Sequence, residues 1–151
     1  MVTEKLASVN LNSFTLIELL VVIGIIALLA SIASVVAIEM RNRGRDTRIQ
    51  TSLTQVRFEA TIIHNTENSY VNLCDTGNTL NDTYDNLRLI EDDVRKYSGL
   101  NPDCYATEDA YCVQAPLATD STKAYCIDSI GFAGIVNLDD CEDTNYDCAS
   151  P

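Results

Sequence analysis

The feature that most constrains this chain is an uninterrupted apolar run near its start. The twenty residues from Leu19 to Ile38 carry no charged side chain. A helix of that length is ~30 Å long, which matches the hydrocarbon core of a bilayer. The apolar region of a secretory signal peptide is shorter, ~7 to 15 residues, and a cleavage site follows it. The run therefore predicts a membrane-spanning helix.

A single carboxylate, Glu18, stands directly before the run. An ionised carboxylate in hydrocarbon costs at least ~2.5 kcal/mol, so a residue of this kind commonly has a partner or a function. The alternative is that the Glu18 side chain reaches the lipid headgroups and has no partner.

Charge is distributed unevenly along the 151 residues, whose formal net charge is −12. Residues 1–64 hold five Asp and Glu against six Lys and Arg, whereas residues 65–151 hold seventeen against four. Phosphate binding depends on Lys and Arg, so we expect no direct nucleic-acid binding by the acidic part. The length leaves room for one compact domain beside the anchor.

Cysteines occur only in the acidic part, and their number is even: Cys74, Cys104, Cys112, Cys126, Cys141 and Cys148. This pattern predicts three disulfides and a location outside the cytoplasm. A zinc site is disfavoured because the chain has no CxxC pair and a single histidine, His64. Four arginines after the apolar run favour the cytoplasm by the positive-inside rule, namely Arg41, Arg43, Arg45 and Arg48. We give the cysteines more weight, because Glu39 and Asp46 dilute that basic cluster.

Apolar periodicity indicates where the helices and strands lie. A helical stripe is formed by Ile49, Leu53, Val56, Ala60 and Ile63. A second helix is predicted from Tyr84 to Tyr97, with Asp82 or Thr83 as its cap and Gly99 at its end. Three β-like runs follow at residues 110–115, 124–129 and 134–138. The order predicts an α+β fold in which a long N-terminal helix packs on a small antiparallel sheet.

The stretch FTLIELLVVIGIIALLASIA, which begins at Phe14, resembles the N-terminal signature of type IV pilins and type II secretion pseudopilins. This resemblance implies that a prepilin peptidase cuts between Ser13 and Phe14 and that the new amino terminus is methylated. It also implies that the Glu18 carboxylate of one subunit pairs with the Phe14 amine of a neighbour. Ser13 occupies the position where the family usually has glycine.

The resemblance and the patterns together imply four segments. Residues 1–13 are a leader, residues 14–40 the transmembrane and filament-core helix, residues 41–64 its amphipathic continuation, and residues 65–151 a disulfide-stapled acidic head. A head of this size buries little apolar surface, so disulfides are expected to compensate. Six cysteines allow fifteen connectivities. We expect Cys112 with Cys126 across a hairpin, Cys141 with Cys148, and Cys74 with Cys104.

The head has one candidate site for a metal ion. Carboxylates crowd near its end at Asp139, Asp140, Glu142 and Asp143. Oxygen ligands at close quarters suit Ca²⁺, although the spacing is not that of an EF-hand and a solvated loop is the alternative. No nucleophile elbow, phosphate loop or HExxH motif occurs, so we expect no enzyme and no other cofactor.

The sequence therefore predicts a type IV pilin-like structural subunit of an extracellular filament, serving adhesion, motility or DNA uptake. Its expected partners are other copies of itself, a prepilin peptidase, an assembly platform and the cytoplasmic membrane, where it resides before assembly. One alternative is a type II secretion pseudopilin. Another is an uncleaved, membrane-anchored binding module outside the cytoplasm.

Overall fold

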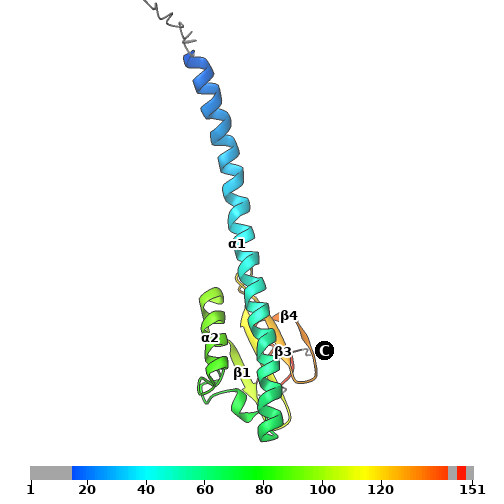
Figure 1. Ribbon diagram of the computed structural model, residues 1–151. Coiled ribbons are helices and arrows are strands. Elements are labelled where there is room, and N and C mark those ends of the chain that lie inside the picture. The colour runs from blue at the N-terminus through cyan, green and yellow to red at the C-terminus, as the bar shows by residue number, and fades with distance from the viewer. Residues whose placement is uncertain (1–14, 143–145, 149–151) are drawn as a thin grey trace, which may run out of the picture. The chain divides into compact units, whose positions relative to one another are not determined.

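The computed structural model describes residues 15–142 and 146–148, apart from the side chains of residues 33–35 (Figure 1). The chain divides into two compact units, residues 1–38 and residues 39–151, and helix α1 contributes to both. The elements follow in the order α1 (Leu16–Glu67), η1 (Val71–Leu73), α2 (Asp85–Ser98), β1 (Asp103–Ala106), β2 (Tyr111–Pro116), β3 (Lys123–Asp128) and β4 (Ala133–Asn137).

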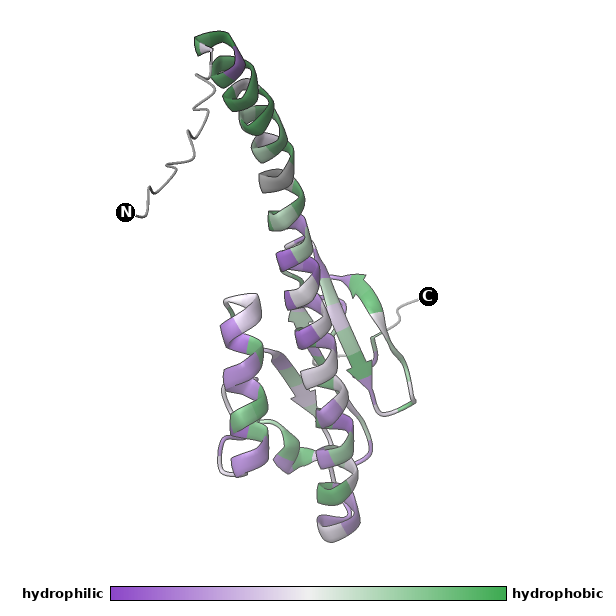
Figure 2. Cartoon of the chain, turned by 45° about the horizontal axis from the view of Figure 1, so that its top comes forward, coloured by the Kyte–Doolittle hydropathy of each residue, from purple (hydrophilic) through white to green (hydrophobic). Residues whose placement is uncertain are grey.

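The four strands form one antiparallel sheet in the order β1-β2-β3-β4, so each strand pairs with the next along the chain. In the second unit, the later turns of α1 lie along one face of this sheet and α2 lies beside them (Figures 1 and 2). The expected α+β class is confirmed, with its long helix, antiparallel sheet and three disulfides. Strand β1 was not predicted.

The hydrophobic core lies between α1, α2 and the sheet. The predicted α1 stripe is buried, from Ile49 with 0% of its surface exposed to Ile63 with 3%. These residues meet Leu87, Ile90 and Val94 of α2 and apolar side chains of the sheet. Burying one such aliphatic side chain stabilises a fold by about 1.5–3 kcal/mol. The head therefore needs this part of α1 to complete its core.

The two ends of α2 are terminated in different ways. Gly99 takes a left-handed conformation with φ of 90°, and its N–H donates to the Arg95 carbonyl, which confirms the predicted glycine end. The predicted cap by Asp82 or Thr83 is wrong, because Tyr84 occupies the N-cap without a side-chain hydrogen bond. Asn81 shapes the preceding turn instead, since its Oδ1 accepts from the Thr83 N–H at 3.1 Å.

The disulfides differ from two of the three expected pairs. Cys74 pairs with Cys104 as expected, with 5.5 Å between Cα atoms. The expected Cys112–Cys126 pair is wrong, because the register places Cys112 opposite Asp128 and Cys126 opposite Gln114. Diagonal neighbours on adjacent strands are about 7–8 Å apart, beyond the usual reach of a disulfide.

The expected Cys141–Cys148 pair is wrong as well. Cys112 bonds to Cys141 and Cys126 to Cys148, so the two sheet cysteines each hold one cysteine of the C-terminal segment. These four cysteines are buried and cluster with Phe132 and Val136, apart from the main core.

Two buried polar side chains support the same attachment. Gln114, with 1% of its surface exposed, accepts from the Cys141 N–H through Oε1 at 3.3 Å. Asp128, also 1% exposed, accepts from the Phe132 N–H at 2.8 Å and from the Cys148 N–H at 3.2 Å. Buried polar groups are satisfied in this way because an unpaired one costs stability. The C-terminal segment is thus fixed to the sheet by both covalent and polar contacts.

Asp46 ties the second unit's part of α1 to the turn between β2 and β3. Its Oδ1 accepts from the Ala118 N–H at 2.6 Å and the Thr119 N–H at 3.3 Å, and its Oδ2 accepts from the Thr119 hydroxyl. Asp46 is 8% exposed, so water cannot readily replace these contacts.

We expect Asp46→Ala to lower the free energy of unfolding by about 2 kcal/mol, because it leaves two backbone N–H donors without their charged acceptor. The measurement is denaturant unfolding of the full chain in detergent. Glu39→Ala is the matched control, since it removes an exposed carboxylate from the same helix, and it should cost at most about 0.5 kcal/mol. Equal losses for the two variants would contradict the anchoring role of Asp46.

Candidate functional site

The first unit presents a helix surface that is apolar all round. From Leu16 to Ile38 the described side chains of α1 are exposed, including Leu20, Ile26 and Leu29 at 58%, 58% and 61%. Among the described residues, α1 is the one helix long and apolar enough to cross a membrane. A helix that is hydrophobic on every side is stable only in lipid or among other helices. This surface is therefore an anchor, an assembly surface, or each in turn.

Glu18 is part of a capping box at the start of this helix. Its Oε2 accepts from the Thr15 N–H at 2.9 Å and from the Thr15 hydroxyl at 2.8 Å. In return, the Thr15 hydroxyl accepts from the Glu18 N–H at 3.3 Å. A carboxylate in the first turn also interacts favourably with the positive end of the helix dipole.

The cap uses half of the carboxylate. The second oxygen of Glu18, Oε1, makes no hydrogen bond to the part of the chain that the structure describes. Ser13 and Phe14, the predicted cleavage and methylation positions, lie outside the described residues. Cleavage, methylation and the pairing of Glu18 with an amine stay predictions.

The carboxylates near the end of the chain do not converge on one point. Asp140 accepts from the Asn137 N–H at 3.0 Å, whereas Asp139 and Glu142 are exposed and line an open hollow of about 370 Å³. Asp143 lies outside the described residues. Within the described part of the chain, no three His, Cys, Asp or Glu side chains are placed to hold a metal ion.

Calcium stays a prediction. A rise in the melting temperature on adding calcium, reversed by a chelator, would support it, and an unchanged melting temperature would contradict it.

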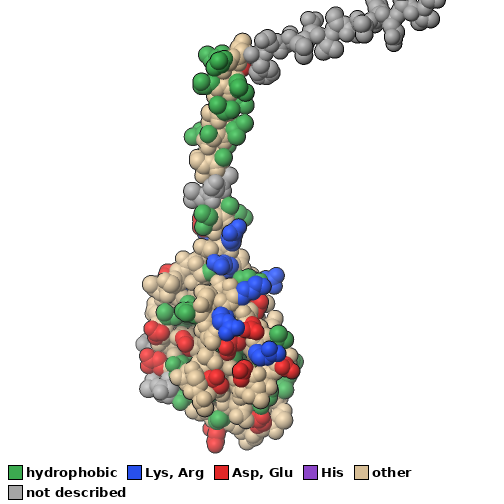
Figure 3. Space-filling model, turned by 90° about the vertical axis from the view of Figure 1, so that its left-hand side faces the viewer, with side chains coloured by type: hydrophobic (Ala, Val, Ile, Leu, Met, Phe, Trp, Pro, Cys, Tyr) green, Lys and Arg blue, Asp and Glu red, His purple; other side chains and the backbone are tan. Residues whose placement is uncertain are grey.

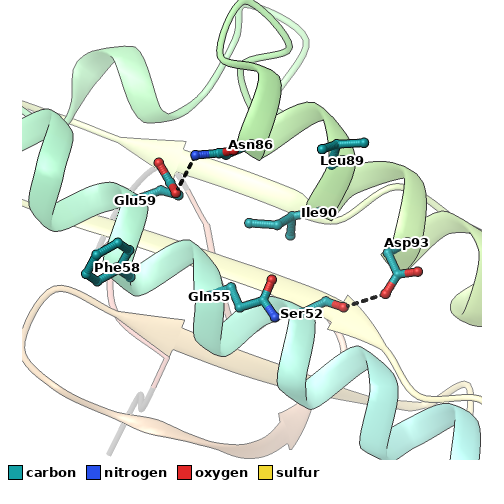
Figure 4. Close-up of a pocket in the computed structure, with 8 residues that line it drawn as sticks. All are labelled: Ser52, Gln55, Phe58, Glu59, Asn86, Leu89, Ile90 and Asp93. Carbon is teal, nitrogen blue, oxygen red and sulfur yellow. Dashed lines mark hydrogen bonds between the residues drawn. The ribbon is translucent and has the colours of Figure 1, made fainter.

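An open groove of about 490 Å³ separates the exposed sides of α1 and α2 (Figure 4). Two polar pairs bridge the helices there: the Ser52 hydroxyl donates to Asp93 at 3.0 Å, and the Asn86 amide donates to Glu59 at 2.8 Å. Ile90 lies between these pairs and is 6% exposed (Figure 4). The groove is thus the seam where two helices pack.

Three residues that hold the second unit together could not be recognised from sequence patterns. Asp46, Asp103 and Gln114 act through contacts with residues distant in the sequence, and no local motif distinguishes them. Thr15 did carry a signal, because a Thr followed three residues later by Glu is the capping-box pattern.

Comparison with known protein families gave a match at the start of the chain. Residues 12–34 match the family model described as the prokaryotic N-terminal methylation motif. Searches of curated proteins and of solved structures returned no significant match. The chain thus carries the signature of type IV pilins and pseudopilins, a motif that implies processing by a prepilin peptidase and indicates a structural subunit rather than an enzyme.

Proposed function

We propose that this protein is a type IV pilin-like subunit that polymerises into an extracellular filament. After removal of residues 1–13 it waits in the cytoplasmic membrane, held by the apolar part of α1. Assembly moves that helix from lipid into a bundle of identical helices, and the acidic heads then cover the filament. Its partners in this process are the prepilin peptidase, the assembly platform and other copies of itself.

The observation that carries this proposal is the combination of the exposed apolar helix with the lone carboxylate at its start. A carboxylate at the edge of an anchor is costly in hydrocarbon, and the helix cap that Glu18 forms with Thr15 occupies only one of its two oxygens. A carboxylate with one unused oxygen, Glu18 Oε1, can accept from the charged amine that cleavage creates on a neighbour. Pairing two charges in a poor solvent favours association and sets the axial register of the helices.

The head fits the same role. Three disulfides and a core completed by α1 make a compact body that can stay folded outside the cell. Lipid tails are as apolar as leucine, so helix packing alone gives little preference for one register. Contacts between heads must therefore act together with Glu18 to determine the axial register of the helices.

The proposal is tested by labelling intact cells with an antibody against residues 65–151. We expect labelled filaments on cells that express the chain with its peptidase and assembly platform, and label confined to the membrane when the peptidase is deleted. Ser13→Gly is the matched variant and should give at least as many filaments. Label that stays on the cell body in every strain would favour the uncleaved binding module.

A further inference from the structure

Three arginines follow the apolar run on a single face of α1. Arg41, Arg45 and Arg48 are separated by four and three residues, so they lie one above another on the helix. We call this set the arginine face. All three are exposed, and none forms an ion pair with a described residue. Figure 3 shows Lys and Arg side chains following one another along one side of the second unit, in a surface where acids otherwise prevail.

Arg43 differs from these three. It lies on the opposite side of the helix and pairs with Glu39 at 2.7 Å. The chain thus neutralises the arginine that faces away and leaves the arginine face without an internal partner among the described residues. Its three guanidinium groups remain available for carboxylates or phosphates, which they bind in bidentate fashion.

A surface of opposite charge occurs on the same unit. Asp103, Asp139 and Glu142 line the open hollow of about 370 Å³. We call this the acidic hollow. Burial raises the pKa of Asp103, and the nearby charge of Asp139 raises it further, although a hydrogen bond from Gln114 opposes both. An incoming cation would relieve that repulsion.

The acidic hollow is held in shape before any partner arrives. The Cys112–Cys141 disulfide and the hydrogen bond to Gln114 Oε1 fix Cys141 between Asp139 and Glu142. Asp103 belongs to strand β1 and accepts from the Gln114 amide at 3.3 Å. A preformed surface loses little conformational entropy on binding, so weak exposed ion pairs can add up there.

We propose that the arginine face of one subunit docks against the acidic hollow of a second copy of this chain. The proposal rests on the proposed function, because it names the contact between heads that assembly needs. The two surfaces are different parts of one chain, so the contact is heterologous. Such contacts build open helical filaments when the rotation does not close a ring.

Anionic lipid is the competing occupant of the arginine face. Arg41 and Arg48 are seven residues apart, which corresponds to about 10 Å along the helix axis. The headgroup layer on each side of a bilayer is about 5–7 Å thick. Headgroups therefore cover only part of the arginine face, whereas a second protein surface can meet all of it.

The test uses the full chain in cells that assemble filaments. The variant Arg41→Gln/Arg45→Gln/Arg48→Gln should yield about tenfold less sheared filament, as expected for the loss of three exposed ion pairs at each contact. Its processing and its amount in the membrane should not change. Arg43→Gln is the control and should assemble like the wild type. Asp139→Asn/Glu142→Asn should show the same loss as the triple variant.

Charge reversal separates the possible outcomes. Arg45→Glu/Arg48→Glu should lose filaments, and adding Asp139→Lys/Glu142→Lys to that variant should restore them. The proposal would be overturned in favour of lipid if the compensating changes did not restore filaments and if the membrane form of Arg45→Glu/Arg48→Glu no longer co-purified with anionic lipid. Normal assembly of the triple variant would overturn it while leaving the proposed function intact. A wild type that is processed but never forms filaments would overturn both.

Discussion

Replacing Glu18 by alanine is expected to lower the yield of sheared filament by at least about a hundredfold. The reason is that the neighbour's amine would then be buried among apolar helices without its partner, a loss of about 3 kcal/mol or more. The measurement compares filament sheared from cells that hold equal amounts of processed protein in the membrane. Glu18→Gln should be nearly as defective, because it keeps the shape of the side chain and removes its charge.

The capping box offers a matched control for that experiment. In the isolated chain, Glu18 binds Thr15, so Glu18→Ala also removes a helix cap. Thr15→Ala removes the hydroxyl half of the box and keeps the carboxylate, which should loosen the first helical turn by about 1 kcal/mol. We expect its filament yield to stay close to that of the wild type. Equal defects in Thr15→Ala and Glu18→Ala would assign Glu18 to capping alone.

Removing the disulfide between Cys126 and Cys148 is expected to lower the stability of the head by about 3 kcal/mol, through the entropy of the 22-residue loop that it closes. In a unit of this size, that loss corresponds to a fall in Tm of about 10 °C. The measurement is thermal unfolding of Cys126→Ala/Cys148→Ala in detergent. A shift of less than about 2 °C would contradict the stabilising role of this disulfide.

A second variant tests the connectivity itself. Cys141→Ala/Cys148→Ala leaves Cys112 and Cys126 on adjacent strands, where the register offsets them by two residues. We expect both thiols to stay free and to react with a thiol reagent after unfolding. A Cys112–Cys126 disulfide in this variant would show that the strands pair in another register.

Local periodicity explains which parts of the fold could be predicted. The α1 stripe from Ile49 to Ile63 has the spacing of one helix face, and a helix with such a face must bury it. Gly99 could be identified because only glycine takes its left-handed conformation at little cost. Strand β1 could not be predicted, because its four residues lack alternation and become a strand only by pairing with β2.

Contacts between residues that are distant in the sequence explain which parts of the fold could not be predicted. The disulfide partners of Cys112 and Cys126 depend on strand register, which no spacing between cysteines encodes. Asp46 looked like a charge that dilutes a basic cluster, yet it is the acceptor that holds the β2–β3 turn. The contact between Glu18 and Thr15 differs from these, because it is local and its Thr-to-Glu spacing of three residues is visible in the sequence.

In the proposed function, the chain is cut before Phe14 and then polymerises at the cell surface. The most direct test is the N-terminal mass of the protein in filaments sheared from cells, compared with the membrane fraction. We expect the sheared protein to begin at a methylated Phe14. A protein that is absent from the sheared material and still begins at Met1 in the membrane would contradict it.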